Sequence, residues 1–401
     1  MDHGTGKTTI IKTVIELYKN QGKKVVLCAP TGRAAKRMTE TTNEEAKTLH
    51  RLLEIGKIED EDKYKSVNTE VTPLDADVVI VDEMSMVDLF LMNHLMKSLY
   101  QGTKLVLVGD SDQLPSVGPG SILKDLINSE RITTIRLNKI FRQAAQSKII
   151  LNSHRVNEGD LFLNKEESDK KDLKEDFFFI KELSQDKILQ QVISLCNGRL
   201  QNYGDYNFFK NIQVITPTKK GMLGTKELNI TLQKYLNPKQ ENLKEKQIGD
   251  TVFRVNDRVM QIKNNYDISW EKQNPDFEIG TGVFNGELGT IEKIDDEEKN
   301  IKIRFDDKKL VWYEYSELDQ IELAYSITIH KAQGSEFDVV IMVMPQSSTM
   351  LLTRNLLYTG MTRAKQMLII IANNNIVEFM IQNADTKKRN TGLEEKIKNL
   401  L

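Results

Sequence analysis

The clearest chemical pattern stands near the start of the chain. Residues 4–9 read Gly-Thr-Gly-Lys-Thr-Thr and run directly into a helix-period pattern of apolar residues that begins at Ile10. Glycines let backbone N–H groups approach phosphate oxygens, a lysine neutralises the terminal phosphates, and a hydroxyl at a helix N-terminus binds Mg²⁺. The spacing is typical of the second half of a phosphate-binding P-loop. We therefore expect ATP binding here, with Lys7 on the β- and γ-phosphates and Thr8 on Mg²⁺.

The candidate nucleotide-binding residues of this segment are Gly4, Thr5, Gly6, Lys7, Thr8 and Thr9. The first glycine of the full motif would fall at Met1, and no strand precedes it. We therefore expect the chain to be truncated inside the loop. For the half motif alone, a glycine-rich turn before a helix is the competing interpretation.

An acidic pair at the end of an apolar run is the second chemical signal. Residues 78–81 are Val-Val-Ile-Val, and Asp82 and Glu83 follow them. A P-loop ATPase needs an aspartate on the magnesium side and a glutamate that acts as a base or orients the attacking water. In isolation, such a pair could equally be a solvated strand end. Because it follows a P-loop in the same predicted domain, we favour the catalytic interpretation.

Three further polar residues could complete this site. Gln113 follows the next predicted strand, which puts its amide at the sheet edge where the γ-phosphate should lie. Arg142, in Ile-Phe-Arg-Gln, and Arg363, in Thr-Gly-Met-Thr-Arg, could reach the site from outside the core of the first domain. An inserted guanidinium contributes about 10³ to 10⁵ in rate. A lone arginine is more often a surface residue, so both assignments depend on the resemblance described below.

The elements that must position these residues follow an alternating pattern. Short apolar, β-branched runs predict buried parallel strands, and helix-period segments such as 8–18 and 32–38 lie between them. This alternation predicts two doubly wound α/β layers. The predicted strands are residues 24–29, 77–82, 104–109, 212–216, 338–344 and 367–372.

Changes of pattern suggest where the domains divide. Period-two alternation at 290–294 and 301–305, joined by an acidic turn, predicts a small antiparallel β-barrel inserted into the second α/β domain. A polar stretch at about 54–73 is either a protruding hairpin or a solvated loop. The expected domains are 1–156, a linker at 157–176, a second α/β domain at 177–247 and 320–384, the inserted barrel at 248–319, and a C-terminal tail at 385–401.

Composition narrows the class of protein without naming a ligand. A chain of 401 residues fits two or three domains, and its formal charge of −2 gives no global basic signature of a nucleic-acid binder. Cys28 and Cys196 have no disulfide or zinc spacing. No run reaches the roughly 18 apolar residues of a membrane span. We expect a cytoplasmic protein, a monomer, with no membrane partner.

Taken in order, several segments resemble the motifs of superfamily 1 helicases. They are G-T-G-K-T-T, A-P-T-G-R-A-A, T-L-H-R-L-L, I-V-D-E-M-S-M, G-D-S-D-Q-L-P-S-V-G-P-G, I-F-R-Q, I-T-I-H-K-A-Q-G-S-E-F-D and L-Y-T-G-M-T-R-A-K. The resemblance is closest to the RecD-like branch and spans nearly the whole chain. It implies two RecA-like domains with an inserted small barrel near the DNA, ATP hydrolysis, and 5′-to-3′ translocation on single-stranded DNA.

The resemblance also implies roles for particular residues. It supports Arg142 and Arg363 as catalytic residues and adds Gly334 and Glu336 to the nucleotide site. The implied DNA contacts are Pro30, Thr31, Arg33, Thr48 and His50 from the first domain, Thr328, His330 and Lys331 from the second, and Asn264, Asn265 and Tyr266 from the barrel. Spacing alone leaves open whether the histidines are satisfied within the fold and whether Tyr266 and Phe284 stack on bases or fill the barrel core.

These expectations describe a helicase motor that couples ATP hydrolysis to unwinding at duplex junctions. A binding module that holds single strands without using ATP is the alternative. RNA also stays open, because backbone contacts distinguish the two nucleic acids poorly. A small-molecule kinase would share the P-loop but would need neither Gln113 nor a second α/β domain. Protein partners are not encoded in any pattern that we recognise.

Overall fold

The computed structural model describes residues 6–55, 71–137, 146–169, 173–273, 277–346, 350–384, 389 and 391–400. They form two compact units, one comprising Met1–Lys174 and Asn383–Leu401, the other Glu175–Gln382. The chain therefore leaves the first unit once and returns to it near its C-terminus. Most of the polar stretch predicted at 54–73 lies outside the described residues.

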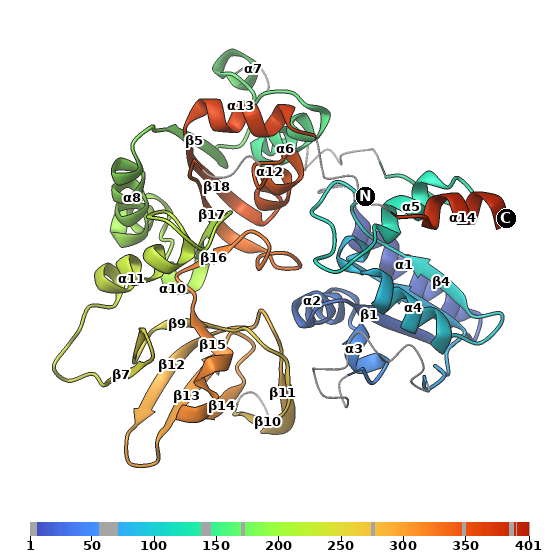
Figure 1. Ribbon diagram of the computed structural model, residues 1–401, viewed down its shortest axis with the longest axis horizontal. Helices are drawn as coiled ribbons and strands as arrows, with labels where there is room; N and C mark the ends of the chain where they lie inside the picture. Colours follow the sequence, from blue (N-terminus) through green and yellow to red (C-terminus); the bar gives the residue numbers. More distant parts are fainter. Residues whose placement is uncertain are drawn as a thin grey trace. The chain divides into compact units, whose positions relative to one another are not determined.

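The first unit is built on a four-stranded parallel sheet with strand order β2-β1-β3-β4 (Figure 1). The strands predicted at 24–29, 77–82 and 104–109 are confirmed, whereas β2 is a three-residue strand that the apolar pattern does not predict. Every residue of β3 is buried, which accounts for its unbroken apolar run. The strands are β1 (Val25–Ala29), β2 (Ala46–Thr48), β3 (Val78–Val81) and β4 (Lys104–Leu107).

Helices cover both faces of this sheet. Val78 and Ile80 of β3 pack with apolar residues of α1, and Val79 and Val81 pack with those of α4. This division follows from the alternation of side chains along a strand. The helices of this unit are α1 (Lys7–Asn20), α2 (Gly32–Thr42), α3 (Leu49–Leu52), α4 (Leu89–Ser98), α5 (Ile122–Asn128), α6 (Lys148–Glu158), α7 (Lys165–Asp169) and α14 (Leu393–Leu400), with a short 3₁₀ turn η2 (Met84–Met86).

The second unit contains a five-stranded parallel sheet in the order β16-β6-β17-β18-β5. The strands predicted at 212–216, 338–344 and 367–372 are confirmed as its three central strands. The elements are β5 (Phe177–Lys181), β6 (Ile212–Thr216), β16 (Ser326–Thr328), β17 (Phe337–Met344), β18 (Ala364–Ala372), α8 (Gln185–Ser194), η4 (Leu195–Arg199), α9 (Leu200–Gly204), α10 (Phe208–Asn211), α11 (Thr225–Leu236), α12 (Arg354–Met361) and α13 (Asn374–Gln382).

A small antiparallel β-domain is inserted between α11 and β16, as predicted. Its seven-stranded sheet has the order β11-β10-β14-β13-β12-β9-β15, and a separate hairpin, β7-β8, precedes it. The acidic turn that follows Asp295 joins β12 to β13. The elements are β7 (Glu245–Ile248), β8 (Thr251–Arg254), β9 (Arg258–Gln261), β10 (Asn265–Lys272), β11 (Glu278–Val283), β12 (Leu288–Asp295), β13 (Asn300–Phe305), β14 (Leu310–Glu314), η5 (Tyr315–Gln320) and β15 (Ile321–Leu323).

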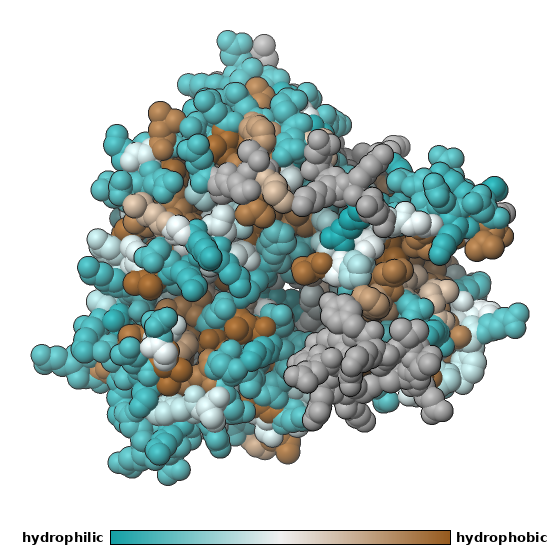
Figure 2. Space-filling model, viewed as in Figure 1, coloured by the Kyte–Doolittle hydropathy of each residue, from teal (hydrophilic) through white to brown (hydrophobic). Residues whose placement is uncertain are grey.

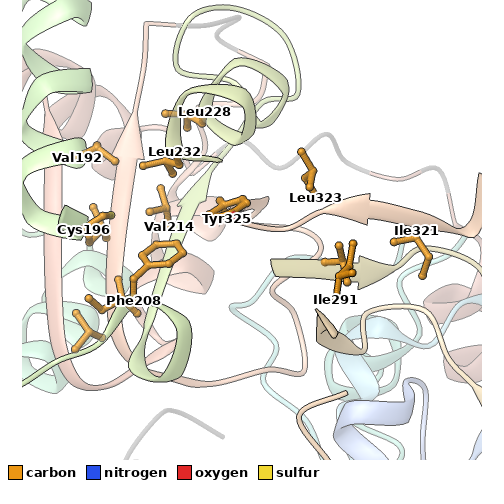
Figure 3. Close-up of a cluster of buried hydrophobic side chains, with 14 of the residues drawn as sticks. Val192, Cys196, Phe208, Val214, Leu228, Leu232, Ile291, Ile321, Leu323 and Tyr325 are labelled. Atoms are coloured by element: carbon orange, nitrogen blue, oxygen red, sulfur yellow. The ribbon is translucent and has the colours of Figure 1, made fainter. Parts of the chain in front are cut away.

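One hydrophobic cluster runs through both parts of the second unit. Figure 3 shows Val214 of β6 and Leu232 of α11 in the same cluster as Ile291 of β12 and Leu323 of β15. Tyr325, which is fully buried, stacks on Phe208 with ring centroids 5.8 Å apart. The β-domain and the parallel sheet are therefore packed as one body.

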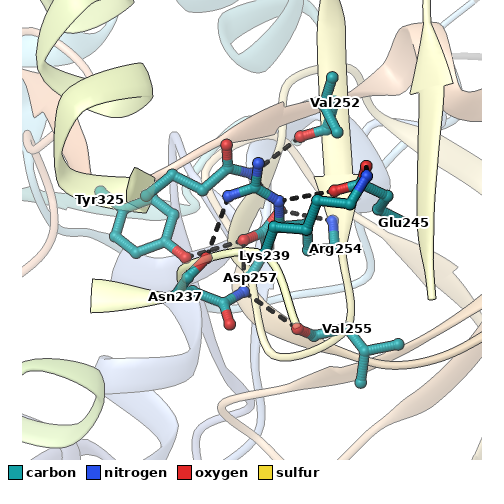
Figure 4. A network of polar contacts seen from close by, with 9 residues as sticks. Asn237, Lys239, Glu245, Val252, Arg254, Val255, Asp257 and Tyr325 are labelled. Atoms are coloured by element: carbon teal, nitrogen blue, oxygen red, sulfur yellow. Dashed lines mark hydrogen bonds and ion pairs between the residues drawn. The ribbon is translucent and has the colours of Figure 1, made fainter. Parts of the chain in front are cut away.

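A buried carboxylate ties the same two parts together (Figure 4). Asp257 has no exposed surface. Its Oδ1 accepts hydrogen bonds from Asn237 Nδ2 at 2.7 Å and from the hydroxyl of Tyr325 at 2.8 Å. Its Oδ2 accepts from Gln233 Nε2 at 2.6 Å and from the backbone N–H of Arg254 at 2.7 Å. The donors come from α11, from the residue after it, from β8 and from the residue before β16.

The surface is predominantly polar on the face that Figure 2 shows, with apolar side chains scattered among hydrophilic ones. Among the described residues, no helix combines the length and apolar character that crossing a membrane requires.

Candidate functional site

The P-loop segment ends in the geometry that phosphate binding requires. Gly6 caps α1 with φ 81° and ψ 24°, a left-handed conformation that glycine adopts without strain. The helix begins at Lys7 and runs for 14 residues, so the positive end of its dipole and its first N–H groups face the loop. Thr8 lies partly buried in its first turn. Gly4 and Thr5 lie outside the described residues, and Thr9 is exposed.

Asp82 and Glu83 stand at the carboxyl end of β3. The Oδ1 of Asp82 accepts a hydrogen bond of 2.8 Å from the backbone N–H of Glu83. Glu83 has φ 54°, an unusual left-handed conformation for a residue other than glycine, which costs about 1–3 kcal/mol. Its side chain is only 4% exposed, and its Oε2 has no hydrogen-bond partner among the described residues. Strain and an unsatisfied buried oxygen on one residue point to function.

The pKa of Asp82 is affected by several charged neighbours, and the P-loop lysine is one of them. Burial raises the pKa of the Asp82 carboxyl, and the neighbouring Glu83 raises it further. Lys7 and Arg37 oppose this, since their positive charges lower the pKa of Asp82. Asp82 and Lys7, which the sequence assigns to one site, therefore act on each other in the folded protein. Arg37, on α2, is an addition to the site. Its one sequence signal is its position one helical turn after Arg33.

Gln113 lies in the loop that follows β4. Its side chain is 4% exposed, and Nε2 donates to Asp110 Oδ2 at 3.2 Å. The loop contacts the acidic strand end directly, because a Cβ atom on Gly109 would lie only 3.0 Å from the backbone nitrogen of Met84. Gln113 also lines a pocket together with Ser85, whose buried hydroxyl has no hydrogen-bond partner among the described residues. Gln113 therefore lies in the same pocket lining as Ser85, which is two residues after Glu83.

Arg363 is buried in the second unit, where it is 2% exposed. Its Nε donates to the carbonyl of Thr359 at 3.0 Å, Nη1 to the carbonyl of Ser335 at 3.2 Å, and Nη2 to Thr362 Oγ1 at 3.0 Å. All three of these acceptors are neutral oxygens. A buried cation with only neutral acceptors is costly, so an anionic partner would stabilise it. Arg142 lies outside the described residues.

The other predicted nucleotide residues of this unit flank the carbonyl that holds Arg363. Ser335 stands between Gly334 and Glu336, and Gly334 has φ 72°. The turn that carries them connects β16 to β17. A rearrangement of this turn would therefore move the carbonyl of Ser335, to which Nη1 of Arg363 donates.

All three threonines predicted to contact DNA serve as helix or turn caps. Thr31 Oγ1 accepts from Ala34 N at 3.3 Å, and Thr48 Oγ1 accepts from Arg51 N at 3.1 Å. Thr328 Oγ1 accepts from the N–H of Lys331 at 3.2 Å. Thr48 and Thr328 are also buried, whereas Pro30, Arg33 and His50 are partly exposed. The capping role explains these threonines without a ligand.

The two basic residues after β16 differ in availability. Lys331 pairs with Glu322 at 2.6 Å, so its charge is already engaged. His330 has an exposed surface, but part of its side chain is buried by neighbouring residues. This burial lowers the pKa of its imidazole below the ordinary value. At neutral pH this ring is therefore neutral and can take part in hydrogen bonds, but it adds no positive charge.

In the β-domain, the predicted residues form one local cluster. The rings of Tyr266 and Phe284 meet edge to face, with centroids 5.5 Å apart. Asn264 Oδ1 accepts from the N–H of Asn285 at 2.9 Å, and Asn265 Nδ2 donates to Gln320 at 3.0 Å. Both asparagines therefore shape the loops, and Tyr266 is partly exposed.

Comparisons with known proteins agree with this architecture. Family models match residues 2–172 (AAA domain), 228–305 (ATP-dependent RecD-like DNA helicase SH3 domain) and 323–371 (UvrD-like helicase C-terminal domain). The chain is 35% identical over 362 residues to the ATP-dependent RecD2 DNA helicase of Deinococcus radiodurans, covering 90% of this chain and 45% of that protein. It is 27% identical to the RecBCD enzyme subunit RecD of Buchnera aphidicola subsp. Schizaphis graminum, covering 93% of this chain and 69% of that one.

A similar fold occurs in the Pif1 helicase from Bacteroides in complex with ADP-AlF3 and single-stranded DNA. The TM-score is 0.55 at 20% identity, over 94% of this chain and 88% of that one. This likeness concerns the fold. The small antiparallel domain is SH3-like, as the matching family model indicates. With a P-loop ATPase unit, a second RecA-like sheet and this insertion in one chain, the protein belongs to the RecD-like superfamily 1 helicases, a family of ATP-dependent DNA helicases.

Proposed function

We propose that this chain is the motor portion of an ATP-driven translocase, which moves 5′ to 3′ on single-stranded DNA and unwinds duplex at a junction. The observation that carries the proposal is Glu83. Its backbone is strained, its Oε2 is buried without a partner, and it adjoins Asp82, on which Lys7 acts electrostatically. A carboxylate held in this way suits a general base for the attacking water.

The residues present fit a magnesium ion. Burial and the charge of Glu83 both disfavour ionised Asp82, so a cation beside it would be stabilising. Within the described ranges, no three His, Cys, Asp or Glu side chains form a metal cluster. This suits Mg²⁺, which is usually held by one or two protein ligands together with phosphate oxygens and water. Asp82 and the hydroxyl of Thr8 would hold it, and the bound ion supplies charge neutralisation of the phosphates.

The remaining side chains of the first unit take defined parts in hydrolysis. Lys7 binds the β- and γ-phosphates, with the N–H groups of α1 around them. Glu83 takes the proton of the attacking water at Oε2. Gln113 contacts the γ-phosphate end of the nucleotide and changes partners when that phosphate leaves. In the part of the chain that is described, its amide is already held by Asp110 in a defined orientation.

Arg363 supplies the positive charge from the second unit. Its three present acceptors are neutral, and its burial makes an anionic partner favourable. In the closed, nucleotide-bound state the guanidinium reaches the phosphates, and hydrolysis releases it. Repeated closure and release would convert ATP turnover into steps along the strand. Arg142 is a second candidate for this positive charge, on the basis of its Ile-Phe-Arg-Gln motif.

DNA is held chiefly through its backbone, since stepping along any sequence cannot depend on base edges. The available surface groups are Pro30, Arg33, His50, His330 and Tyr266, all at least partly exposed. The choice of DNA, the 5′-to-3′ direction and the action at junctions are supported by the resemblance to RecD-like helicases. The chain spans 45% of the length of the Deinococcus relative.

The decisive experiment compares ATP hydrolysis with and without single-stranded DNA. We expect DNA to stimulate hydrolysis, and Lys7→Ala and Glu83→Gln to abolish it for different reasons. Lys7→Ala should weaken ATP binding. Glu83→Gln should leave ATP binding intact and lower the hydrolysis rate about 10²- to 10⁴-fold. Lys12→Ala is a matched control, because Lys12 is an exposed lysine on the same helix. Equal hydrolysis in the presence and absence of DNA would contradict the motor function.

The alternative is a module that holds single strands without using ATP. Fluorescence anisotropy with labelled single-stranded DNA, with and without nucleotide, separates the two. A motor should change its DNA affinity when ATP is added, whereas a nucleotide-independent module should not. Unwinding of duplexes with a 5′ or a 3′ tail then tests the direction. Unwinding that requires a 3′ tail would overturn the proposed polarity.

A further inference from the structure

The C-terminal segment is bound to the first unit by an arginine that the sequence does not single out. Arg389 donates four hydrogen bonds to residues 116–120, which follow Gln113 and which we call the 116–120 loop. Its Nη1 lies 2.5 Å from the carbonyl oxygen of Gly118 and 2.7 Å from that of Gly120. Nη1 also donates to Ser116 Oγ at 3.3 Å, and Nη2 donates to the carbonyl of Ser116 at 2.5 Å.

Within the 116–120 loop, Ser116 Oγ donates to the carbonyl of Gly118 at 3.1 Å. Pro119 has no N–H to donate, and Gly118 and Gly120 leave the backbone permissive. The start of α4 limits it on one side, where Leu89 N donates to the carbonyl of Pro119 at 2.9 Å. A Cβ atom on Gly118 would lie only 2.0 Å from Asp88 Oδ2. The guanidinium of Arg389 donates to the carbonyls of Ser116, Gly118 and Gly120, so the loop is held both by α4 and by Arg389.

The position of this loop affects the surroundings of Gln113. Ser116, which provides two of the four acceptors for Arg389, lines the same pocket as Gln113 and Ser85. Only two residues, Leu114 and Pro115, separate Ser116 from Gln113. A shift of Ser116 would therefore be transmitted to the side chain that we assign to the γ-phosphate.

Beyond Arg389 the C-terminal segment is attached to the first unit at two further points. Thr391 Oγ1 donates to Asp125, and Leu393 packs against the core of that unit. The contact of Arg389 with the 116–120 loop is therefore part of a longer attachment within the first unit.

We propose that Arg389 is a positioning residue for Gln113, which it serves by holding the 116–120 loop in place. This inference rests on the proposed function, in which Gln113 contacts the γ-phosphate end of ATP. The positioning acts through hydrogen bonds to the loop backbone, and Arg389 itself does not touch nucleotide.

Arg389→Ala tests the role of the guanidinium, and Arg389→Lys tests whether a single flexible donor can replace a planar one. We expect Arg389→Ala to lower the DNA-stimulated kcat at least about 10-fold, while KM for ATP changes less than about twofold, because small misplacements near a reacting group cost up to about 10²-fold. Arg389→Lys should be intermediate. Arg131→Ala is the matched control, since exposed Arg131 donates to the carbonyl of Lys398 in the same segment, away from the loop.

Amide hydrogen exchange provides a readout that does not depend on catalysis. Exchange in the 116–120 loop should rise in Arg389→Ala and stay unchanged in Arg131→Ala. Unchanged loop exchange in Arg389→Ala would overturn the inference, whether or not the chain hydrolyses ATP. Faster loop exchange with an unaltered stimulated kcat would overturn it as well. If the wild-type chain shows no stimulation by DNA, the proposed function fails, and loop exchange alone decides whether Arg389 holds the loop.

Discussion

Replacing Asp257 with asparagine tests how firmly the β-domain is attached to the second parallel sheet. Each carboxylate oxygen of Asp257 accepts two hydrogen bonds, and all four donors are fixed on separate elements. An asparagine keeps one oxygen but turns an NH₂ group towards two of these donors. If the NH₂ group faces Gln233 and Arg254, both of their hydrogen bonds are lost. If it faces Asn237 and Tyr325, the Tyr325 hydroxyl can turn and accept, so only the hydrogen bond from Asn237 is lost.

The magnitude follows from the type of bond that is lost. Losing one hydrogen bond to a charged group costs about 1.5–3 kcal/mol, and the three hydrogen bonds that remain weaken because the new side chain is neutral. Removing a buried charge offsets part of this loss. We therefore expect Asp257→Asn to lower the free energy of unfolding of the second unit by about 2–4 kcal/mol, a large fraction of the about 5–15 kcal/mol that stabilises a typical domain.

Tryptophan fluorescence can follow this unit selectively during unfolding in urea. The chain has two tryptophans, Trp270 and Trp312, and both lie in the β-domain. Asp319→Asn is the control, since Asp319 is an exposed acid whose pairing with Lys263 should contribute less than about 1 kcal/mol. A loss below about 1 kcal/mol in Asp257→Asn, equal to that of the control, would refute the idea that this carboxylate attaches the β-domain.

Two further predictions concern the motor itself. Arg363→Lys should lower the DNA-stimulated kcat by about 10³-fold with little change in KM for ATP, because a lysine cannot reproduce the planar guanidinium. Steady-state kinetics would measure both constants. An unchanged kcat would exclude Arg363 from the reaction. The pKa of His330 is lowered by desolvation, so its ring is neutral at pH 7 and gains charge only below the ordinary imidazole range. Affinity for single-stranded DNA should therefore rise as the pH falls below about 6.5, and the excess over a His330→Gln variant should vanish at pH 7–8. An equal pH dependence in both proteins would rule out a DNA contact by the protonated ring of His330.

Local patterns predict the parts of the site that depend on neighbouring residues in the chain. The apolar run of β3 followed by two acids predicts where Asp82 and Glu83 stand, since the ends of buried parallel strands meet at one sheet edge. The threonine caps could also have been predicted, because Thr48 precedes a helix by one residue. Period-two alternation similarly predicts the antiparallel strands on either side of Asp295.

Other features depend on contacts between distant parts of the chain and leave no local signal. The left-handed backbone of Glu83 could not be predicted, because glutamate has no preference of its own for this conformation. Arg37 acts on Asp82 from a helix 45 positions earlier, by the difference 82 − 37. Arg389 meets the 116–120 loop from more than 260 residues away. In a charged tail, one arginine is indistinguishable from its neighbours until the fold brings it to its acceptors.

The continuous core of the second unit bears on how such chains are assembled in evolution. The RecD-like SH3 family model begins at residue 228, within α11, rather than at the first strand of the β-domain. Leu228 and Leu232 of that helix belong to the same cluster as Ile291 and Leu323. The matched segment thus includes the helix residues that pack on the β-domain. A recombinant exchange of this domain between relatives should be cut before α11, because a cut at the first strand would separate these residues from their packing partners.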